Sequence, residues 1–266
     1  MYRTILVPVD PSAGGEAALP VAATLARQAG AGIELLGVVP SGADDTGARE
    51  HLAERAHPLP VAAETRVVAS DDVAGAIRAQ ADDADTLVCM ETRARRPITE
   101  AVLGSVADEV VRELHRPVLL VGPHCGPAPE RFATMVVGLD GSDLAEAILP
   151  VVRDWSTGLG ITPWVFQVLT ERMPLEVGGE DVHESAYVHR VASRLQHEGV
   201  PAEFEVSREH QAAPAIADFA ADQPASLVAV TTHGRSGISR VALGSAAGEV
   251  VRRATVPVLV VRPEQG

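Results

Sequence analysis

Two short stretches near the C-terminus hold the residue types that bind phosphate groups. Gly234 is followed, after nine residues, by Gly244-Ser245, which opens an amphipathic helical pattern. A helix start leaves backbone N–H groups unpaired at the positive end of the helix dipole, so it attracts anions. His233 and Arg235 beside Gly234 add donors, and Arg235 adds a permanent positive charge. These residue types suit a phosphate site, and the alternative is an ordinary helix start after a strand.

The elements that must position these residues form an alternating pattern. Short, nearly continuous apolar runs indicate parallel strands that are covered on both faces, and helical segments separate them. In the first 121 residues the expected strands are 4–10, 33–39, 65–68, 86–90 and 117–121, and the expected helices end near residue 30 or span 49–56, 72–80 and 104–114. This alternation predicts a doubly wound parallel five-stranded sheet.

The same pattern occurs twice in the chain. The strand 135–140 repeats the first strand at an offset of 130, and Gly244-Ser245 repeats Gly104-Ser105 at an offset of 140. Residues 101–121 and 241–261 are identical at 12 of 21 aligned positions. We therefore expect two domains, 1–123 and 133–266, a Pro/Gly-rich linker at 124–132, and an insertion of about ten residues within 171–184.

These motifs resemble the universal stress protein family. The phosphate loop of that family is Gly, two residues, Gly, nine residues and Gly-Ser or Gly-Thr, and here Thr231 replaces the first glycine. The strand that ends in Asp140 and the closing strand 257–261 also fit the family's layout, so the resemblance covers nearly the whole chain. It implies a tandem member with two Rossmann-like, adenine nucleotide alpha-hydrolase-like domains related by a pseudo-two-fold axis.

The resemblance also implies a ligand and a set of residues that bind it. In nucleotide-binding members, the aspartate after the first strand and the backbone near the end of the second hold adenosine, which here implies Gly138, Asp140 and Val168. The phosphate side would comprise Thr231, His233, Gly234, Arg235, Gly244, Ser245 and Ala246. The implied cofactor is ATP, with or without Mg²⁺. Asp140 before Gly141-Ser142 fits a turn and helix N-cap equally well.

The N-terminal half keeps only part of this set. Its second, weaker site would comprise Asp10, Val38, Gly104 and Ser105. The loop glycines have become Glu91 and Ala94, and a carboxylate at Glu91 would repel phosphates unless the arginines that follow it neutralise its charge. We therefore interpret this half as structural and expect nucleotide binding to be confined to the C-terminal half.

Other chemistry finds no support in the sequence. It contains no Gly-x-x-x-x-Gly-Lys-Ser/Thr loop, no Gly-x-Ser-x-Gly elbow and no His-Glu-x-x-His zinc pair. His183 and His189 flank Glu184, but their spacing fits no common metal site, and surface histidines are the better interpretation. We predict no catalytic residue and no metal ligand.

The charge and composition of the chain bear on its binding partners and on its location in the cell. A formal net charge of -14 argues against binding to nucleic acid or to anionic membranes. No apolar run approaches the roughly 18 residues of a membrane span, and the first residues show no signal-peptide pattern. Cys89 in an apolar run and Cys125 in the linker fit a reducing compartment. We therefore expect a cytoplasmic protein.

Two functions remain after these exclusions. The first is a non-catalytic stress-response protein that binds ATP as a regulatory ligand and thereby changes the surface it offers to a protein partner. The alternative is a nucleotide-independent interaction module with a dimer-like architecture; a hydrolase ranks third, because no residue is placed to activate water. We also expect the halves to pair through strands 117–121 and 257–261, and the whole chain to form a homodimer.

Overall fold

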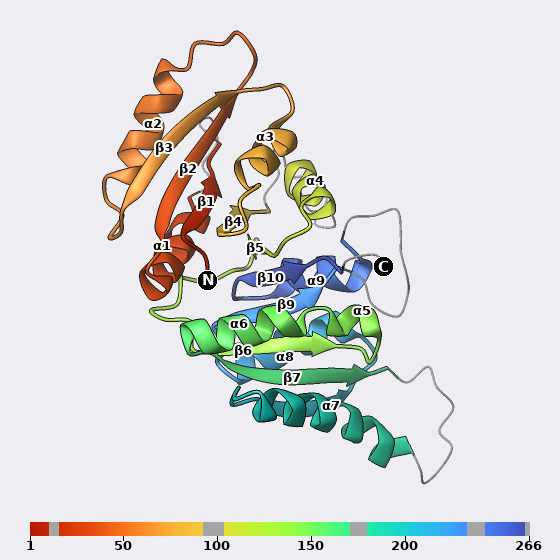
Figure 1. Cartoon of the computed structure of the whole chain (residues 1–266). Coiled ribbons are helices and arrows are strands. Elements are labelled where there is room, and N and C mark those ends of the chain that lie inside the picture. The colour runs from red at the N-terminus through yellow and green to blue at the C-terminus, as the bar shows by residue number, and fades with distance from the viewer. Residues whose placement is uncertain (11–15, 93–103, 171–179, 233–242, 264–266) are drawn as a thin grey trace.

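The computed structural model describes residues 1–10, 16–92, 104–170, 180–232 and 243–263, and the side chains of residues 180–185 lie outside this description. Ten strands form one sheet in the order β3-β2-β1-β4-β5-β10-β9-β6-β7-β8 (Figure 1). Their bounds are β1 Thr4–Pro8, β2 Gly32–Val39, β3 Ala63–Ala69, β4 Thr86–Glu91, β5 Val118–Val121, β6 Thr134–Leu139, β7 Thr162–Leu169, β8 Glu203–Arg208, β9 Leu227–Thr231 and β10 Val258–Val261.

Helices cover both faces of this sheet. Their bounds are α1 Ala18–Ala29, α2 Thr46–Ala56, α3 Val73–Gln80, α4 Ser105–Glu113, α5 Asp143–Glu146, α6 Leu149–Leu159, α7 Glu180–His197, α8 Ala212–Asp222 and α9 Ser245–Arg253. One core holds apolar side chains of α1, α2, α6 and α7, and the other holds those of α3, α4, α8 and α9. The sheet therefore lies between two helical layers, and each half contributes two of the longer helices to each layer.

The halves meet in an antiparallel pair of strands. Leu119 of β5 lies opposite Leu259 of β10, while every other strand pair in the sheet is parallel. This arrangement confirms the predicted doubly wound fold and the predicted pairing of the last strands. As a consequence, the carboxyl ends of the strands point in opposite directions in the two halves.

Helices α1 and α6 also link the two halves. Gln28 of α1 accepts a hydrogen bond from the Phe132 amide and donates to the carbonyl oxygens of Phe132 and Leu159, at 2.7–2.9 Å. Tyr2 packs edge-to-face against Trp155, with ring centroids 6.1 Å apart. Since these groups are buried or half-buried, the halves form one packed body.

The segment predicted as a linker is fixed in place. His124 Nδ1 lies 2.6 Å from the Arg252 carbonyl oxygen, and the Gly126 amide donates to Thr255 at 2.8 Å. Arg252 lies in the last turn of α9, where helix carbonyl groups lack intrahelical partners, and Thr255 follows that helix. The linker therefore caps a helix of the C-terminal half.

Element boundaries follow the sequence prediction closely. Strand β3 is longer than expected, α2 begins three residues earlier, and Asp72 is the N-cap of α3, with its carboxylate accepting from the Gly75 amide. Much of the predicted insertion lies outside the described residues, but its end forms the first turn of α7.

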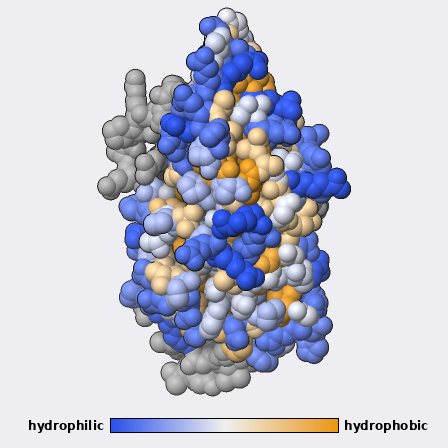
Figure 2. Space-filling view, turned by 90° about the vertical axis from the view of Figure 1, so that its left-hand side faces the viewer, coloured by the Kyte–Doolittle hydropathy of each residue, from blue (hydrophilic) through white to orange (hydrophobic). Residues whose placement is uncertain are grey.

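The molecule is elongated, with its halves stacked end to end (Figures 1 and 2). On the face shown in Figure 2, hydrophobic residues form small separate patches among hydrophilic ones. No helix in the described part of the chain has the length and apolar character to cross a membrane.

The close contact between Gly122, which follows β5, and α9 gives a stability prediction. A Cβ atom at Gly122 would lie 2.0 Å from the Val251 carbonyl oxygen, which is backbone and cannot move aside easily. Replacing Gly122 with Ala should lower the free energy of unfolding by about 1–3 kcal/mol. Urea denaturation of both proteins measures the difference.

The matched control is Gly126→Ala in the linker that follows. There the added Cβ would lie 3.5 Å from the Thr255 carbonyl oxygen, an ordinary contact. Equal destabilisation by the two substitutions would show that the Gly122 contact is not the cause.

Candidate functional site

The predicted site residues gather where the strand order of the C-terminal half reverses. From β6 the chain moves to β7 and β8 on one side, whereas β9 lies on the other side of β6 and leads to β10. Asp140 directly follows β6, and Thr231 ends β9. In doubly wound sheets ligands bind at this crevice, beyond the carboxyl ends of the strands.

Gly244 fixes the start of α9 against the end of β9. Its amide donates to the Thr232 carbonyl oxygen at 2.8 Å, and a Cβ atom there would lie 2.6 Å from that oxygen. Its φ of -55° is open to any residue, so the close approach is what requires glycine. From the sequence, we interpreted Gly244 only as leaving room for a phosphate. The structure shows that it also leaves room for the chain's own backbone.

The first residues of α9 face outward. Ser245 and Ala246 are exposed, and no side chain caps the helix at Gly244. The first amides of a helix lack intrahelical acceptors, so these groups can accept an anion as partner. The N-terminal half repeats this geometry, since the Gly104 amide donates to the Thr92 carbonyl oxygen at 3.0 Å and Ser105 is exposed.

Asp140 takes part in a turn. Its Oδ1 atom accepts hydrogen bonds from the Ser142 amide at 3.0 Å and from the Ser142 hydroxyl at 2.6 Å. Ser142 in turn caps α5, because its hydroxyl oxygen accepts from the Ala145 amide at 3.2 Å. The turn and N-cap interpretation of Asp140 is therefore correct, and the half-buried carboxylate still lies at the strand-order reversal.

The two residues predicted to face adenosine besides Asp140 lie on neighbouring strands. A Cβ atom at Gly138 would lie 3.0 Å from Ile216 Cδ1 and 3.3 Å from Val230 Cγ1, so this glycine has a packing reason of its own. Val168 is half-buried, one residue before the end of β7, and packs on the side of α8. Both are consistent with a ligand near the strand ends, but neither identifies one.

The loop between β9 and α9 is described only at its two ends. Thr231 and Thr232 are 8% and 1% exposed, and the Thr232 amide donates to the Val261 carbonyl oxygen at 2.9 Å. The β-branched residue at the family's first glycine position is therefore packed within the sheet. His233, Gly234 and Arg235 lie outside the described residues.

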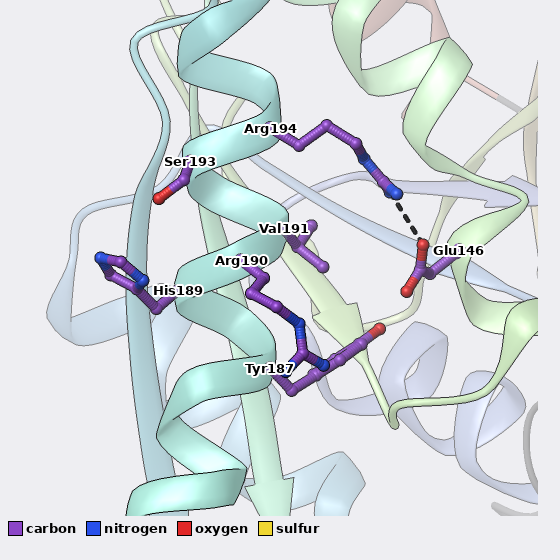
Figure 3. A pocket seen from close by; sticks show the side chains of 7 residues that line it. All are labelled: Glu146, Tyr187, His189, Arg190, Val191, Ser193 and Arg194. Atoms are coloured by element: carbon purple, nitrogen blue, oxygen red, sulfur yellow. Dashed lines mark hydrogen bonds and ion pairs between the residues drawn. The ribbon is translucent and has the colours of Figure 1, made fainter.

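A cavity that the sequence did not indicate lies beside this site. It has a volume of about 510 Å³ between α5 and α7, and Figure 3 shows Tyr187 and Arg194 directed toward Glu146. Arg194 and Glu146 form an ion pair of 2.8 Å. Burial raises the pKa of Tyr187, and the charges of Glu146 and Asp140 raise it further.

No sequence motif could have indicated this cavity, because it depends on how α7 packs after the insertion. His189, also on α7, points away from Tyr187 (Figure 3) and makes an edge-to-face contact with Phe204 at 5.3 Å. Within the described ranges, no three His, Cys, Asp or Glu side chains are grouped to hold a metal ion.

The N-terminal site contains its own carboxylate. Glu91, at the end of β4, accepts a hydrogen bond from the amide of Ala17, the N-cap of α1. Asp10 follows β1, and Val38 is half-buried in β2, as at the matched positions of the other half. Glu91 directly precedes Thr92, whose carbonyl oxygen accepts from Gly104 at the start of α4, so its carboxylate adds negative charge near the place where the second site would bind phosphate.

One side chain connects the N-terminal half to the start of α9. The half-buried Asp108, in the first turn of α4, accepts a hydrogen bond from the backbone of Leu243, next to Gly244. Burial raises the pKa of its carboxyl group, and Arg112 and the Leu243 bond oppose that rise. The matched residue in α9 is Gly248, which has no side chain to return the contact.

Asp108→Asn should change how stability depends on pH. A raised pKa in the folded protein means that the protonated form is favoured, so its stabilising effect is present below the ordinary value of 3.8 and is lost as pH rises through the folded pKa. The asparagine keeps an acceptor for Leu243 and has no charge to bury. Its stability advantage over the parent protein should therefore grow from pH 3.8 to neutral pH in denaturant titrations. An advantage that stays constant over this interval would contradict the prediction.

The sequence matches the model of the universal stress protein family over residues 1–122 and 131–262. A universal stress protein of Mycobacterium tuberculosis is 27% identical over 190 residues, which cover 67% of this chain and 59% of that protein. One from Mycolicibacterium smegmatis is 28% identical over 181 residues, 66% of this chain and 62% of the relative. The chain therefore spans about three fifths of the length of these curated relatives.

Solved structures show the same fold over the whole chain. The crystal structure of a universal stress protein from Archaeoglobus fulgidus has a TM-score of 0.72 at 18% identity and covers 98% of this chain and 99% of its own. A functionally unknown protein from Pseudomonas aeruginosa has a TM-score of 0.68 at 20% identity, with 98% and 93% covered. With both halves matched by the family model, the chain belongs to the universal stress protein family as a tandem two-domain member.

Proposed function

We propose that the chain is a cytoplasmic, non-catalytic stress-response protein that binds ATP in its C-terminal half as a regulatory ligand. The observation that carries this proposal is the meeting of Asp140 and the exposed start of α9 at the strand-order reversal. In nucleotide-binding members of the family these two positions hold adenosine and phosphates, respectively. The domain limits 1–123 and 133–266, with the linker 124–132, are part of this proposal.

The bound nucleotide would change the surface that the protein offers to a partner, and it would not be hydrolysed. Asp140 is engaged with Ser142, and no further acid or base among the residues described at the site is positioned to activate water. ATP, with or without Mg²⁺, would add negative charge next to Leu243 and so act on the contact with Asp108. Nucleotide bound in the C-terminal half would thereby affect α4 of the N-terminal half. A protein partner or a second copy of the chain could respond to that change.

The second candidate is a nucleotide-independent interaction module. Thr231 favours it, because a β-branched residue stands where nucleotide-binding members have glycine, and its side chain is almost fully buried. The packed junction of the halves also favours it, since the pair already has the architecture of a dimer.

Calorimetry with Mg-ATP distinguishes these candidates. We expect one site per chain, and Ser245→Ala should weaken binding by about tenfold, because one hydrogen bond to a charged phosphate is lost. Ser105→Ala is the matched control, since Ser105 has the same place and exposure in the other half, and it should leave affinity unchanged.

Ser245 is a better test than Gly244, because any Cβ at Gly244 would displace the Thr232 contact even without a ligand. Two equal sites, or a loss of affinity in Ser105→Ala alone, would refute the proposed asymmetry. Binding that appears only after Thr231→Gly would favour the interaction module.

A further inference from the structure

A second groove lies on the opposite helical layer, between β8 and α8. It has a volume of about 500 Å³, and its lining includes Phe166, Phe219 and the carboxylates of Glu205, Asp218 and Asp222. Neither β8 nor α8 contributes a residue to the predicted nucleotide site. The groove is therefore a separate feature of the C-terminal half.

Two aromatic rings, Phe166 and Phe219, line this groove, and Trp164 packs against one of them. Phe166 and Phe219 are stacked, with centroids 4.1 Å apart and planes within 1° of parallel, and Trp164 meets Phe219 edge-on at 5.9 Å. Phe166 is buried, whereas Phe219 and Trp164 are half-buried, so solvent reaches part of the aromatic surface. Aromatic faces attract cations, and arginine in particular stacks on them.

The rim of the groove is acidic and is not neutralised by the described residues. Its four exposed carboxylates are Glu205, Glu209, Asp218 and Asp222. Among the ion pairs of the described part of the chain, none involves any of these four groups. Like charges held near one another are stabilised by a cationic ligand that brings opposite charge.

The edge of the sheet lies along the same groove. β8 is the last strand in the sheet order, and within the described ranges no strand pairs with its outer side. An unpaired strand edge offers backbone donors and acceptors to an extended segment of another chain. A peptide that lay along β8 could place alternate side chains in the groove.

The internal repeat provides a comparison for these features. Arg66 lies opposite Leu36 in the same register in which Glu205 lies opposite Phe166, so Arg66 is the counterpart of Glu205. It forms an ion pair of 2.6 Å with Glu34, the counterpart of Trp164. The N-terminal half therefore has a neutralised surface in place of the aromatic, acidic groove.

Helices α3 and α8 extend this comparison. The buried residues Ala74 and Ile77 match Ala213 and Ile216 at a constant offset of 139. At this offset Asp218 corresponds to Ala79 and Phe219 corresponds to Gln80. Both the acid and the exposed aromatic ring are thus specific to the C-terminal half.

We propose that the groove between β8 and α8 binds an extended, arginine-rich segment of a partner protein. The carboxylates would pair with guanidinium groups, Phe219 would stack on them, and the open edge of β8 would hold the backbone. This proposal does not depend on nucleotide binding.

Fluorescence anisotropy tests it with a labelled ten-residue peptide of alternating Arg and Thr. The parent protein should bind this peptide, and an otherwise identical Glu-Thr peptide should not bind. Glu205→Arg, which installs the residue of the N-terminal half, should weaken binding by about tenfold because it places like charges in contact. Phe219→Gln keeps the charge of the groove and should weaken binding by about threefold through loss of the aromatic contact.

The matched control is Glu50→Arg on the exposed side of α2, in the N-terminal half. It changes the net charge by the same amount as Glu205→Arg. It should leave peptide affinity within about twofold, since surface charges beyond a Debye length are screened. Equal weakening by Glu50→Arg and Glu205→Arg would show attraction to net charge alone and would overturn the proposal. Displacement of the peptide by equimolar spermidine would also overturn it, because the groove would then recognise a free polycation.

Discussion

The antiparallel contact of β5 with β10 is the constraint on which the rest of the structure depends. Each half alone would expose an apolar edge strand, Val118–Val121 or Val258–Val261, whose residues are almost fully buried here. Exposed strand edges invite aggregation, and pairing them removes both edges at once. The same contact makes α1 and α6 neighbours on one face, so that Gln28 can bridge to Phe132 and Leu159.

The fold was predictable because it depends on patterns that recur along the chain. Continuous apolar runs indicated parallel strands, and the offset repeat indicated two copies, whose pairing follows from the need to cover two equivalent edges. The helix after Gly244 was predictable for the same reason. The cavity near Tyr187 was not, because a pocket depends on the angle at which α7 packs, and neither hydrophobic periodicity nor any motif encodes that angle.

The candidate site shows how much single residues in the sequence can predict. Asp140 and Gly244 were identified correctly as residues at strand and helix ends, yet each also has a structural role: Asp140 holds the turn to α5, and Gly244 allows contact with Thr232. A motif therefore marks a position where the backbone needs a given residue type, and that need exists with or without a ligand. The exposed Ser245 takes part in neither of these contacts, and Ser105 is exposed at the matched position of the other half.

The two halves have diverged by placing charge differently on one scaffold. In the N-terminal half, Glu91 satisfies the start of α1 and Arg66 pairs with Glu34, so acids and bases are matched within the fold. In the C-terminal half, the carboxylates around Asp218 form no ion pair among the described residues. Duplication permits this division, because the two halves share the stabilising strand contact while only one has to keep surfaces open. A half whose charges are paired internally supplies rigidity, and a half whose charges are left unmatched supplies places where ligands of opposite charge can bind.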